Sequence, residues 1–151
     1  MTLMTQLLDS FGSEMNIYFA GAIRGGREDV ALYLEIIALL KNYGHIHTEH
    51  IGDLELSSFG EAGNDREIHD RDVAWLKDSD CLVAEVTTPS LGVGYEIAKA
   101  TEWGKRVLCL YRPVEGRALS AMIAGCGGVS VREYHSVSDL KDVFDRFFAA
   151  S

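Results

Sequence analysis

Residues 88–96, with the sequence Thr-Pro-Ser-Leu-Gly-Val-Gly-Tyr-Glu, combine an anion-binding turn with a carboxylate at the start of a predicted helix. Gly92 and Gly94 allow a ligand close to the backbone. The first amides of a helix lack internal partners, so they can bind an anion. Glu96 lies on the apolar face of this helix, because apolar residues stand three before it and four after it. This arrangement suits a phosphorylated substrate that a glutamate attacks.

A second carboxylate, Asp72, lies in the apolar stripe of another predicted helix. It stands four residues after Ile68 and four before Leu76. Burial would raise the pKa of Asp72 and suit it to donate a proton, although a buried aspartate bonded to a loop amide fits the position equally well. Glu96, in the first turn of its helix, would be kept ionised by the helix dipole, which also explains a glutamate there without any chemistry. Two carboxyl groups in opposed environments are typical equipment for cleaving a glycosidic bond.

Four further candidates lie near the expected strand ends. The loop Ala22–Gly26 contains glycines and Arg24, and it either holds one phosphate or forms a tight turn with a solvated arginine. The chain contains neither a GxGxxG nor a GxxxxGK[ST] motif, so dinucleotide and P-loop chemistry are unsupported. Tyr18 points to the opposite face from its apolar neighbours, and a core tyrosine is the commoner outcome there. His50 ends a strand and is weak evidence, while Ser120 has the position of a helix-capping serine.

The composition indicates one soluble domain with a small-molecule ligand. A chain of 151 residues, of which 47% are hydrophobic, can form one complete core. The net charge of −9 argues against a nucleic-acid polymer or an anionic membrane as partner, because both need a basic surface. Three cysteines without a CxxC pair indicate a reducing compartment, and neither a membrane-spanning run nor a signal peptide is recognisable, so we expect a cytoplasmic protein. None of the histidines has metal-ligand spacing, and we expect no metal and no cofactor.

Strand-like and helix-like segments alternate along the chain after a weakly patterned extension, residues 1–14. The predicted strands are Asn16–Gly21, His45–Ile51, Cys81–Val86, Arg106–Arg112 and Val129–Tyr134. The predicted helices are a segment ending near Tyr43 with Gly44 as its stop, Asp65–Asp78, Val93–Trp103, a short patch at Leu119–Ala124, and Val137–Ala149 with Ser136 or Ser138 as its cap. A polar loop, Gly52–Gly63, is long enough to be a lid or part of a binding wall.

This alternation predicts an α/β fold for residues 15–151, with a parallel sheet between two layers of helices. Five strands in a doubly wound domain of this size favour the flavodoxin-like (Rossmann-like) order 2-1-3-4-5. Ligands in such sheets bind beyond the carboxyl ends of the strands, at the switch between strands one and three. The loops at that point are Ala22–Gly26 and Thr87–Gly92, which are the two glycine-bearing loops already singled out.

Taken together, several segments resemble one known enzyme family. They are Tyr18–Asp29, Thr48–His50, Ile68–Asp72, Ala84–Thr87, Pro89–Glu96 and Leu119–Ile123. In this collinear order, which extends over residues 16–149, the chain closely resembles the 2′-deoxynucleoside 5′-phosphate N-hydrolases (the Rcl proteins), a branch of the nucleoside 2-deoxyribosyltransferase superfamily. The resemblance implies a homodimeric N-glycosidase that converts deoxynucleoside monophosphates to free base and 2-deoxyribose 5-phosphate, without metal or cofactor.

The resemblance also implies roles for individual residues. Glu96 would be the nucleophile that attacks C1′ and forms a glycosyl-enzyme ester. Asp72 would assist departure of the base and then activate water, and Tyr18 would hold the reacting groups near the sugar. The remaining implied contacts bind the substrate: Ile23, Arg24, Ser90 and Gly92 at the 5′-phosphate, Ser120 of the partner subunit at the same phosphate, and His50 near the base.

One position departs from the family pattern, and three other activities compete with hydrolysis. Family members often have serine at the position of Ala22, so one hydroxyl donor worth about 1 kcal/mol is missing from the phosphate loop. We expect weaker phosphate discrimination and an unchanged reaction.

The alternatives to deoxynucleotide hydrolysis are a deoxyribosyltransferase that exchanges bases, a ribonucleotide hydrolase, and a non-catalytic nucleotide-binding sensor. Arg24, Ser90 and Ser120 favour a 5′-phosphate and hence the hydrolase, whereas two carboxylates beside an anionic ligand argue against a sensor.

Overall fold

The computed structural model describes residues 15–22, 27–47 and 64–150. The expectations for Ile23, Arg24 and His50, for the extension 1–14 and for the loop 52–63 therefore lie outside the described residues. The strands are β1 (Asn16–Ala20), β2 (His45–His47), β3 (Cys81–Glu85), β4 (Arg106–Tyr111) and β5 (Val129–Glu133). The helices are α2 (Arg27–Leu40), α3 (Asp65–Asp78), α4 (Leu91–Glu102), α5 (Ala121–Ala124) and α6 (Leu140–Ala149), the last preceded by a 3₁₀ turn, Val137–Asp139.

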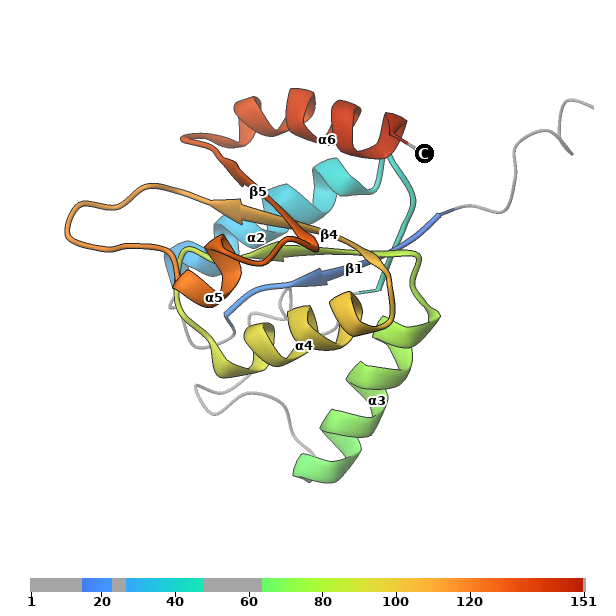
Figure 1. Cartoon of the computed structure of the whole chain (residues 1–151). Helices are drawn as coiled ribbons and strands as arrows, with labels where there is room; N and C mark the ends of the chain where they lie inside the picture. The colour runs from blue at the N-terminus through green and yellow to red at the C-terminus, as the bar shows by residue number, and fades with distance from the viewer. Residues whose placement is uncertain (1–14, 23–26, 48–63, 151) are drawn as a thin grey trace, which may run out of the picture.

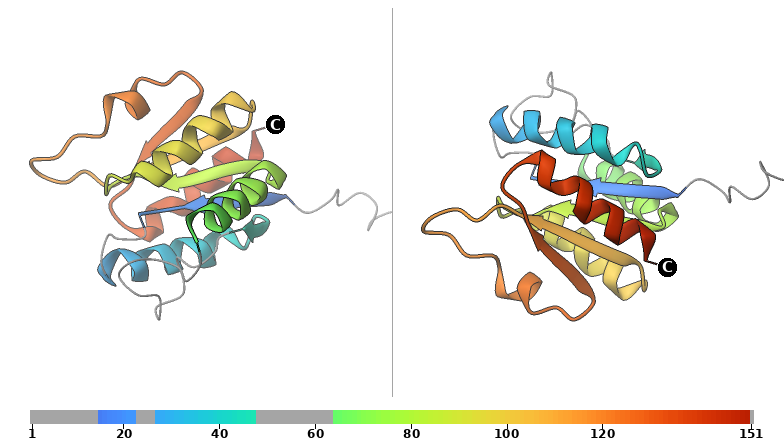
Figure 2. Two further views of the ribbon diagram at one scale, coloured as in Figure 1. Left: turned by 90° about the horizontal axis from the view of Figure 1, so that it is seen from below. Right: turned by 90° about the horizontal axis from the view of Figure 1, so that it is seen from above.

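The five strands form one parallel sheet in the order β2-β1-β3-β4-β5, which confirms the predicted topology. Helices α2 and α6 lie on one face of the sheet, and α3 and α4 lie on the other (Figures 1 and 2). Strands β1 and β3 are direct neighbours, with Phe19 beside Val83. The neighbouring strands β1 and β3 are not consecutive along the chain, and the helices that follow them lie on opposite faces of the sheet (Figure 1). The loops after β1 and β3 therefore diverge and leave the switch-point crevice between them.

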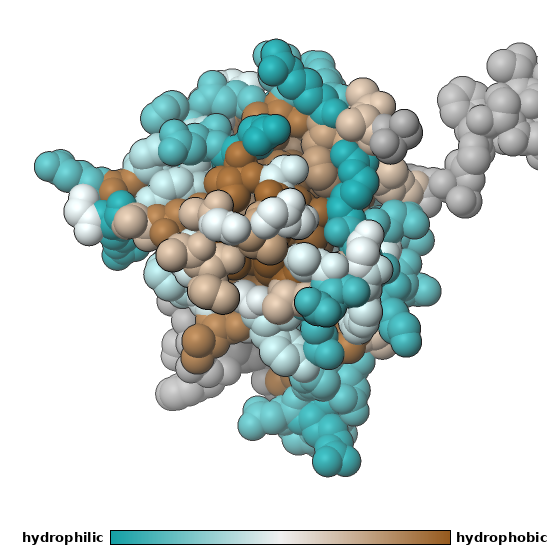
Figure 3. All heavy atoms as spheres, in the orientation of Figure 1, coloured by the Kyte–Doolittle hydropathy of each residue, from teal (hydrophilic) through white to brown (hydrophobic). Residues whose placement is uncertain are grey.

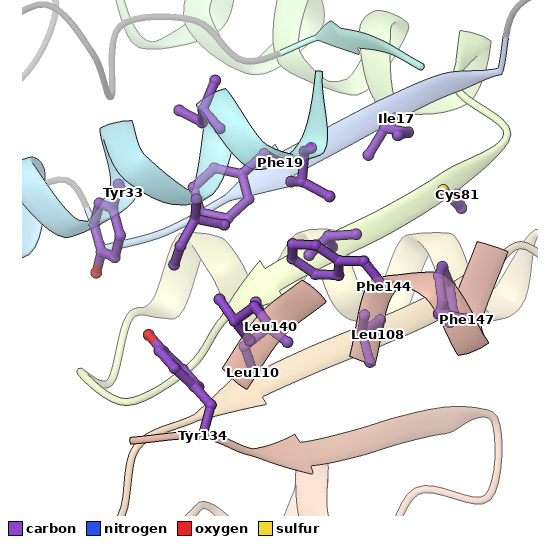
Figure 4. Close-up of a cluster of buried hydrophobic side chains, with 14 residues drawn as sticks. Ile17, Phe19, Tyr33, Cys81, Leu108, Leu110, Tyr134, Leu140, Phe144 and Phe147 are labelled. Carbon is purple, nitrogen blue, oxygen red and sulfur yellow. The ribbon is translucent and has the colours of Figure 1, made fainter. Parts of the chain in front are cut away.

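Alternate residues of β1 enter two separate cores. Ile17 and Phe19 pack with α2 and α6 in the cluster drawn in Figure 4. Tyr18 and Ala20 pack on the other side, where Leu76 of α3 also lies. The period-2 alternation of a strand produces this division, and it confirms that Tyr18 points away from its apolar neighbours. Tyr18 is thereby directed toward the layer that contains α3 and α4.

Several helix ends differ from the sequence prediction, among them the start of α4, the end of α2 and the start of α6. Helix α4 begins at Leu91 rather than at Val93, because the Ser90 hydroxyl caps it by accepting the Val93 amide at 3.3 Å. Helix α2 ends at Leu40 rather than near Tyr43. Gly44 is needed for close packing, since a Cβ there would collide with the Met15 carbonyl.

The third difference is at the C-terminus. Ser136, one of the two predicted caps, forms a capping box with Asp139 around a 3₁₀ turn. Helix α6 itself begins only after this turn, at Leu140. The predicted start of the helix at Val137 is therefore the start of the turn that leads into it.

Candidate active site

Three predicted catalytic residues meet where β1 faces α3 and α4. The Tyr18 hydroxyl is hydrogen-bonded to the Glu96 carboxylate, and Asp72 is close enough to act on it electrostatically. The Oε2 atom of Glu96 is buried and has no hydrogen-bond partner among the described residues. A buried carboxylate oxygen without a partner is costly in a purely structural setting, so it indicates a group reserved for a ligand.

Burial raises the pKa of Glu96 to about 7, the Tyr18 hydrogen bond lowers it, and the nearby Asp72 charge raises it further. The expectation that the helix dipole keeps Glu96 ionised is therefore wrong. Because α4 begins at Leu91, Glu96 lies beyond the first turn and away from the exposed amides. Desolvation, rather than the dipole, dominates its environment.

Asp72 has a wetter environment than the sequence indicates. Its side chain is 26% exposed, and its Oδ1 accepts hydrogen bonds from Arg71 Nε at 3.2 Å and Nη2 at 3.0 Å. The Arg71 guanidinium also lies over the ring of Trp75, 4.8 Å from the centroid. The two carboxyl groups do occupy unlike environments, but the buried one is Glu96 and not Asp72. A guanidinium accompanies Asp72 instead.

An exposed bridge connects the helices that bear the two carboxylates. Nε2 of His69 lies 2.8 Å from the Tyr95 hydroxyl, and Nδ1 of the same ring lies 2.9 Å from Asp70 Oδ1. Tyr95 directly precedes Glu96, and His69 lies one helical turn before Asp72. The bridge therefore fixes α3 to α4 close to the carboxyl groups of Glu96 and Asp72. Sequence patterns do not reveal it, since both partners are exposed and 26 positions apart.

The two predicted phosphate-binding serines lie in a groove on the other flank of α4. The groove has a volume of about 670 Å³, and the loop after β3, α4 and α5 line it. Ser90 and Ser120 both face it, and each hydroxyl accepts a backbone amide hydrogen bond at 3.3 Å. A Cβ at Gly92 would meet only Ser90 Oγ at 3.8 Å, so space remains open above the first turn of α4. Glu96 does not line this groove, so the described residues form two groups on either side of α4.

Sequence reasoning missed a buried charge at the same end of the sheet. Glu85, the last residue of β3, is the only charged residue in the buried class within the described ranges. The available signal was a carboxylate at the end of an apolar strand, which predicts either an exposed strand end or a paired buried charge. No group of three or more His, Cys, Asp or Glu side chains in the described part of the chain could hold a metal ion. The absence of a metal requirement stays a prediction.

Glu96 makes stability depend on pH. Its folded pKa of about 7 lies above the ordinary 4.5, so ionising it opposes folding. This cost is thus absent below pH 4.5. The free energy of unfolding falls as pH rises from 4.5 through 7, by on the order of 3 kcal/mol in total. We expect Glu96→Gln to be clearly more stable than the native protein at pH 8 and nearly equal to it at pH 4.5. Urea unfolding at both pH values tests this, with the exposed Glu35→Gln as control; an equal difference at the two pH values would contradict the burial of Glu96.

Comparison with known proteins identifies similar sequences over almost the whole domain. Residues 17–136 match the family model for nucleoside 2-deoxyribosyltransferase. The chain is 50% identical over 140 residues to the 5-hydroxymethyl-dUMP N-hydrolase of Rattus norvegicus, covering 89% of this chain and 85% of the relative. It is 49% identical over 139 residues to the 5-hydroxymethyl-dUMP N-hydrolase of Homo sapiens, covering 89% and 79%.

Two solved structures have the same fold. A CMP N-glycosidase, BcmB, from Clostridium botulinum superposes with a TM-score of 0.62 at 17% identity, covering 86% of this chain and 98% of that one. A 2-deoxyribosyltransferase from Bacillus psychrosaccharolyticus superposes with a TM-score of 0.64 at 18% identity, covering 84% and 90%. At these identities the likeness concerns the fold alone.

Proposed function

The chain belongs to the nucleoside 2-deoxyribosyltransferase family, and from this premise we propose that it hydrolyses the N-glycosidic bond of 2′-deoxynucleoside 5′-monophosphates. The products are the free base and 2-deoxyribose 5-phosphate. The observation that carries the proposal is the buried Glu96 carboxylate, which contacts Tyr18, lies near Asp72 and retains one oxygen without a partner. The names of the rat and human relatives make 5-hydroxymethyl-dUMP the first substrate to test.

Two displacements at C1′ account for the chemistry. In the first, Glu96 attacks C1′, the bond from C1′ to the base nitrogen breaks, and Asp72 assists departure of the base by relaying a proton from solvent to it. In the second, water attacks C1′, Asp72 accepts a proton from the water, and the ester bond to Glu96 breaks. Tyr18 donates a hydrogen bond to the carboxylate and thereby fixes its orientation.

The raised pKa of Glu96 is compatible with this nucleophilic role. A pKa of about 7 leaves roughly half of the groups ionised at neutral pH. Positive charge develops on the sugar in the transition state, and a carboxylate with little water around it stabilises that charge strongly. Desolvation thus lowers the ionised fraction while it increases the electrostatic stabilisation that each ionised group provides.

The phosphate end of the substrate holds the sugar in place. Ser90 and Gly92 lie at the first turn of α4, where a hydroxyl and free amides can bind an anion. Ile23 and Arg24 complete the proposed phosphate site, and His50 is proposed to contact the base. Binding a group that does not react positions the carbon that does.

Release of free base is the direct test of the proposed function. The protein is incubated with 5-hydroxymethyl-dUMP and with each common deoxynucleoside monophosphate, and free base is quantified by liquid chromatography. We expect free base and 2-deoxyribose 5-phosphate from at least one of them. Failure to release base from any deoxynucleoside monophosphate would contradict the proposal. A second free base in the same mixture tests for transfer, since formation of a new nucleotide would indicate a deoxyribosyltransferase.

We further propose that the active form is a homodimer in which a second copy covers the groove between α4 and α5. Leu91 is 96% exposed and Met122 is 82% exposed, and both line this groove. Apolar residues gather at the centre of the face that carries α4 and α5 (Figure 3). Burying such side chains against a second chain is favourable. In this arrangement Ser120, exposed at the start of α5, reaches the phosphate in the partner's site.

Mixing two impaired variants tests the contribution of Ser120. Glu96→Ala chains lack the nucleophile and Ser120→Ala chains lack the hydroxyl, but a mixed dimer has one site with both native residues. We expect co-expressed chains to reach roughly a quarter of native activity through random pairing. A mixture no more active than its separate components would contradict the shared site. Sedimentation velocity of the native protein gives its oligomeric state.

The cysteines support a cytoplasmic location as part of the same proposal. Cys81, Cys109 and Cys126 are all free thiols, and the first two are buried. Free thiols without a disulfide are typical of a reducing compartment. In the described part of the chain no helix is long and apolar enough to span a membrane.

A further inference from the structure

Glu85 is a buried carboxylate with well-defined partners, and it has no role in the proposed hydrolysis. It has no exposed surface. Its Oε1 accepts the Thr87 amide at 2.6 Å, and its Oε2 accepts the Tyr134 hydroxyl at 2.8 Å. Arg112 Nε lies 3.6 Å from Oε2. A buried carboxylate is tolerated only where hydrogen bonds and a counter-charge offset its desolvation, and Glu85 has both.

Arg112 extends this ion pair to the other loop of the switch point. Its Nη2 lies 3.3 Å from Oδ1 of Asp29, and Oδ2 of Asp29 accepts the Thr88 hydroxyl at 3.0 Å. Asp29 is in the first turn of α2, directly after the loop that follows β1, whereas Thr88 is in the loop that follows β3. The Arg112 amide also donates to the Thr87 hydroxyl at 2.9 Å. The contacts therefore form a continuous link between two segments that are 59 residues apart.

Two buried tyrosines support the same end of the sheet. The hydroxyls of Tyr33 and Tyr134 point toward this end in Figure 4. Tyr33 is hydrogen-bonded to the Ala22 backbone, and a Cβ at Gly21 would lie 2.9 Å from its ring. Burial, followed by the charges of Glu85 and Asp29, raises the pKa of Tyr33, so its hydroxyl stays neutral. The start of the loop after β1 thus rests on a rigid ring.

We propose that Glu85, Arg112, Asp29 and Thr88 form a brace that fixes the spacing between the two phosphate-binding loops. This inference rests on the proposed function, and it assigns these four as positioning residues that do not touch the substrate. A phosphate held from two loops needs donors that converge within hydrogen-bond distance, and a shift of about 1 Å in one loop removes contacts.

Charge and geometry make opposite predictions for this brace. Two carboxylates and one guanidinium carry net negative charge beside an anion site, so by charge alone the brace opposes phosphate binding. Removing the charge of Asp29 should then tighten binding. If Asp29 acts by positioning, removing its ion pair should weaken binding instead. Asp29→Asn therefore distinguishes the two effects by sign.

Titration calorimetry with inorganic phosphate and with 2-deoxyribose 5-phosphate tests the brace without turnover. We expect Thr88→Val, which keeps the shape and deletes the hydroxyl, to raise both Kd values about five- to tenfold. Thr88→Ser, which retains the hydroxyl, should stay near the native Kd. Asp29→Asn should raise the Kd values similarly. In turnover assays the loss should appear mainly in KM for nucleoside monophosphates, with kcat near its native value.

Controls separate the brace from the proposed reaction. Asp142→Asn, an exposed charge loss on α6, should leave phosphate binding unchanged, and melting curves verify that each variant is folded. Unchanged or tighter phosphate binding in both Thr88→Val and Asp29→Asn would overturn the brace even in an active hydrolase. A native protein that binds phosphate but releases no base would overturn the proposed function and leave this comparison intact. A native protein that binds neither inorganic phosphate nor 2-deoxyribose 5-phosphate would overturn the brace, whatever its activity.

Discussion

Replacing Glu96 with alanine is expected to lower kcat for deoxynucleotide hydrolysis by at least about a thousandfold while the nucleotide still binds. In the proposed mechanism Glu96 provides the oxygen that forms the ester with C1′, and the Tyr18 hydroxyl is hydrogen-bonded to its carboxylate. Phosphate binding involves the first turn of α4, where Ser90 lies, so Kd should change far less than kcat. Single-turnover rates and calorimetry on the same variant measure the two quantities separately.

The identity of the nucleophile has its own test. Native enzyme quenched with acid during turnover should carry a deoxyribose phosphate ester on the peptide that contains Glu96, as detected by mass spectrometry. An adduct on the peptide that contains Asp72 would reverse the two roles. The exposed Glu35→Ala on α2 controls for loss of a glutamate, and its kcat should equal that of the native protein. Substantial residual turnover in Glu96→Ala would remove Glu96 as the nucleophile.

Local patterns were sufficient for the fold. Helix α3 has its predicted bounds, Asp65–Asp78, because Asn64 caps it and polar residues follow it. The strand order follows from alternation and chain length alone. The predicted helix Val93–Trp103 begins two residues after the start of α4, because Gly92 indicates a loop. That small error changed the chemistry, because it placed Glu96 in the first turn and thus under the helix dipole.

Long-range pairs in the candidate site could not be predicted. The link from Thr88 to Asp29 and the bridge from His69 to Tyr95 depend on how distant segments meet, and one sequence contains no signal for such pairs. The environment of Glu96 likewise depends on how distant segments meet. Its desolvation arises from the approach of β1 and α3, whereas helical periodicity establishes only which face of α4 it shares. Residue types and spacing thus indicate Glu96 and Asp72 as the proposed reacting groups, whereas tertiary packing sets the pKa of Glu96.

Asp72→Asn is expected to lower kcat about a hundredfold and also to shift the pH dependence of kcat/KM. The amide keeps the shape of the side chain, but it cannot donate a proton to the leaving base or accept one from water. It also removes a negative charge that raises the pKa of Glu96. Activity in the native enzyme should rise as pH increases through about 7, because Glu96 must be ionised to attack. In Asp72→Asn this rise should occur at lower pH.

The two readouts distinguish proton transfer from a structural role. If Asp72 had only a structural role in α3, Asp72→Asn would lower kcat but leave the acid limb of the pH profile in place, because the pKa of Glu96 would not change. Asp78→Asn is the matched control, since Asp78 is exposed at the far end of the same helix. It should leave both kcat and the acid limb near the native values. A lower kcat in Asp72→Asn with an unmoved acid limb would show that Asp72 and Glu96 are not electrostatically coupled in the free enzyme, and the pairing of the two carboxyl groups would then have to be abandoned.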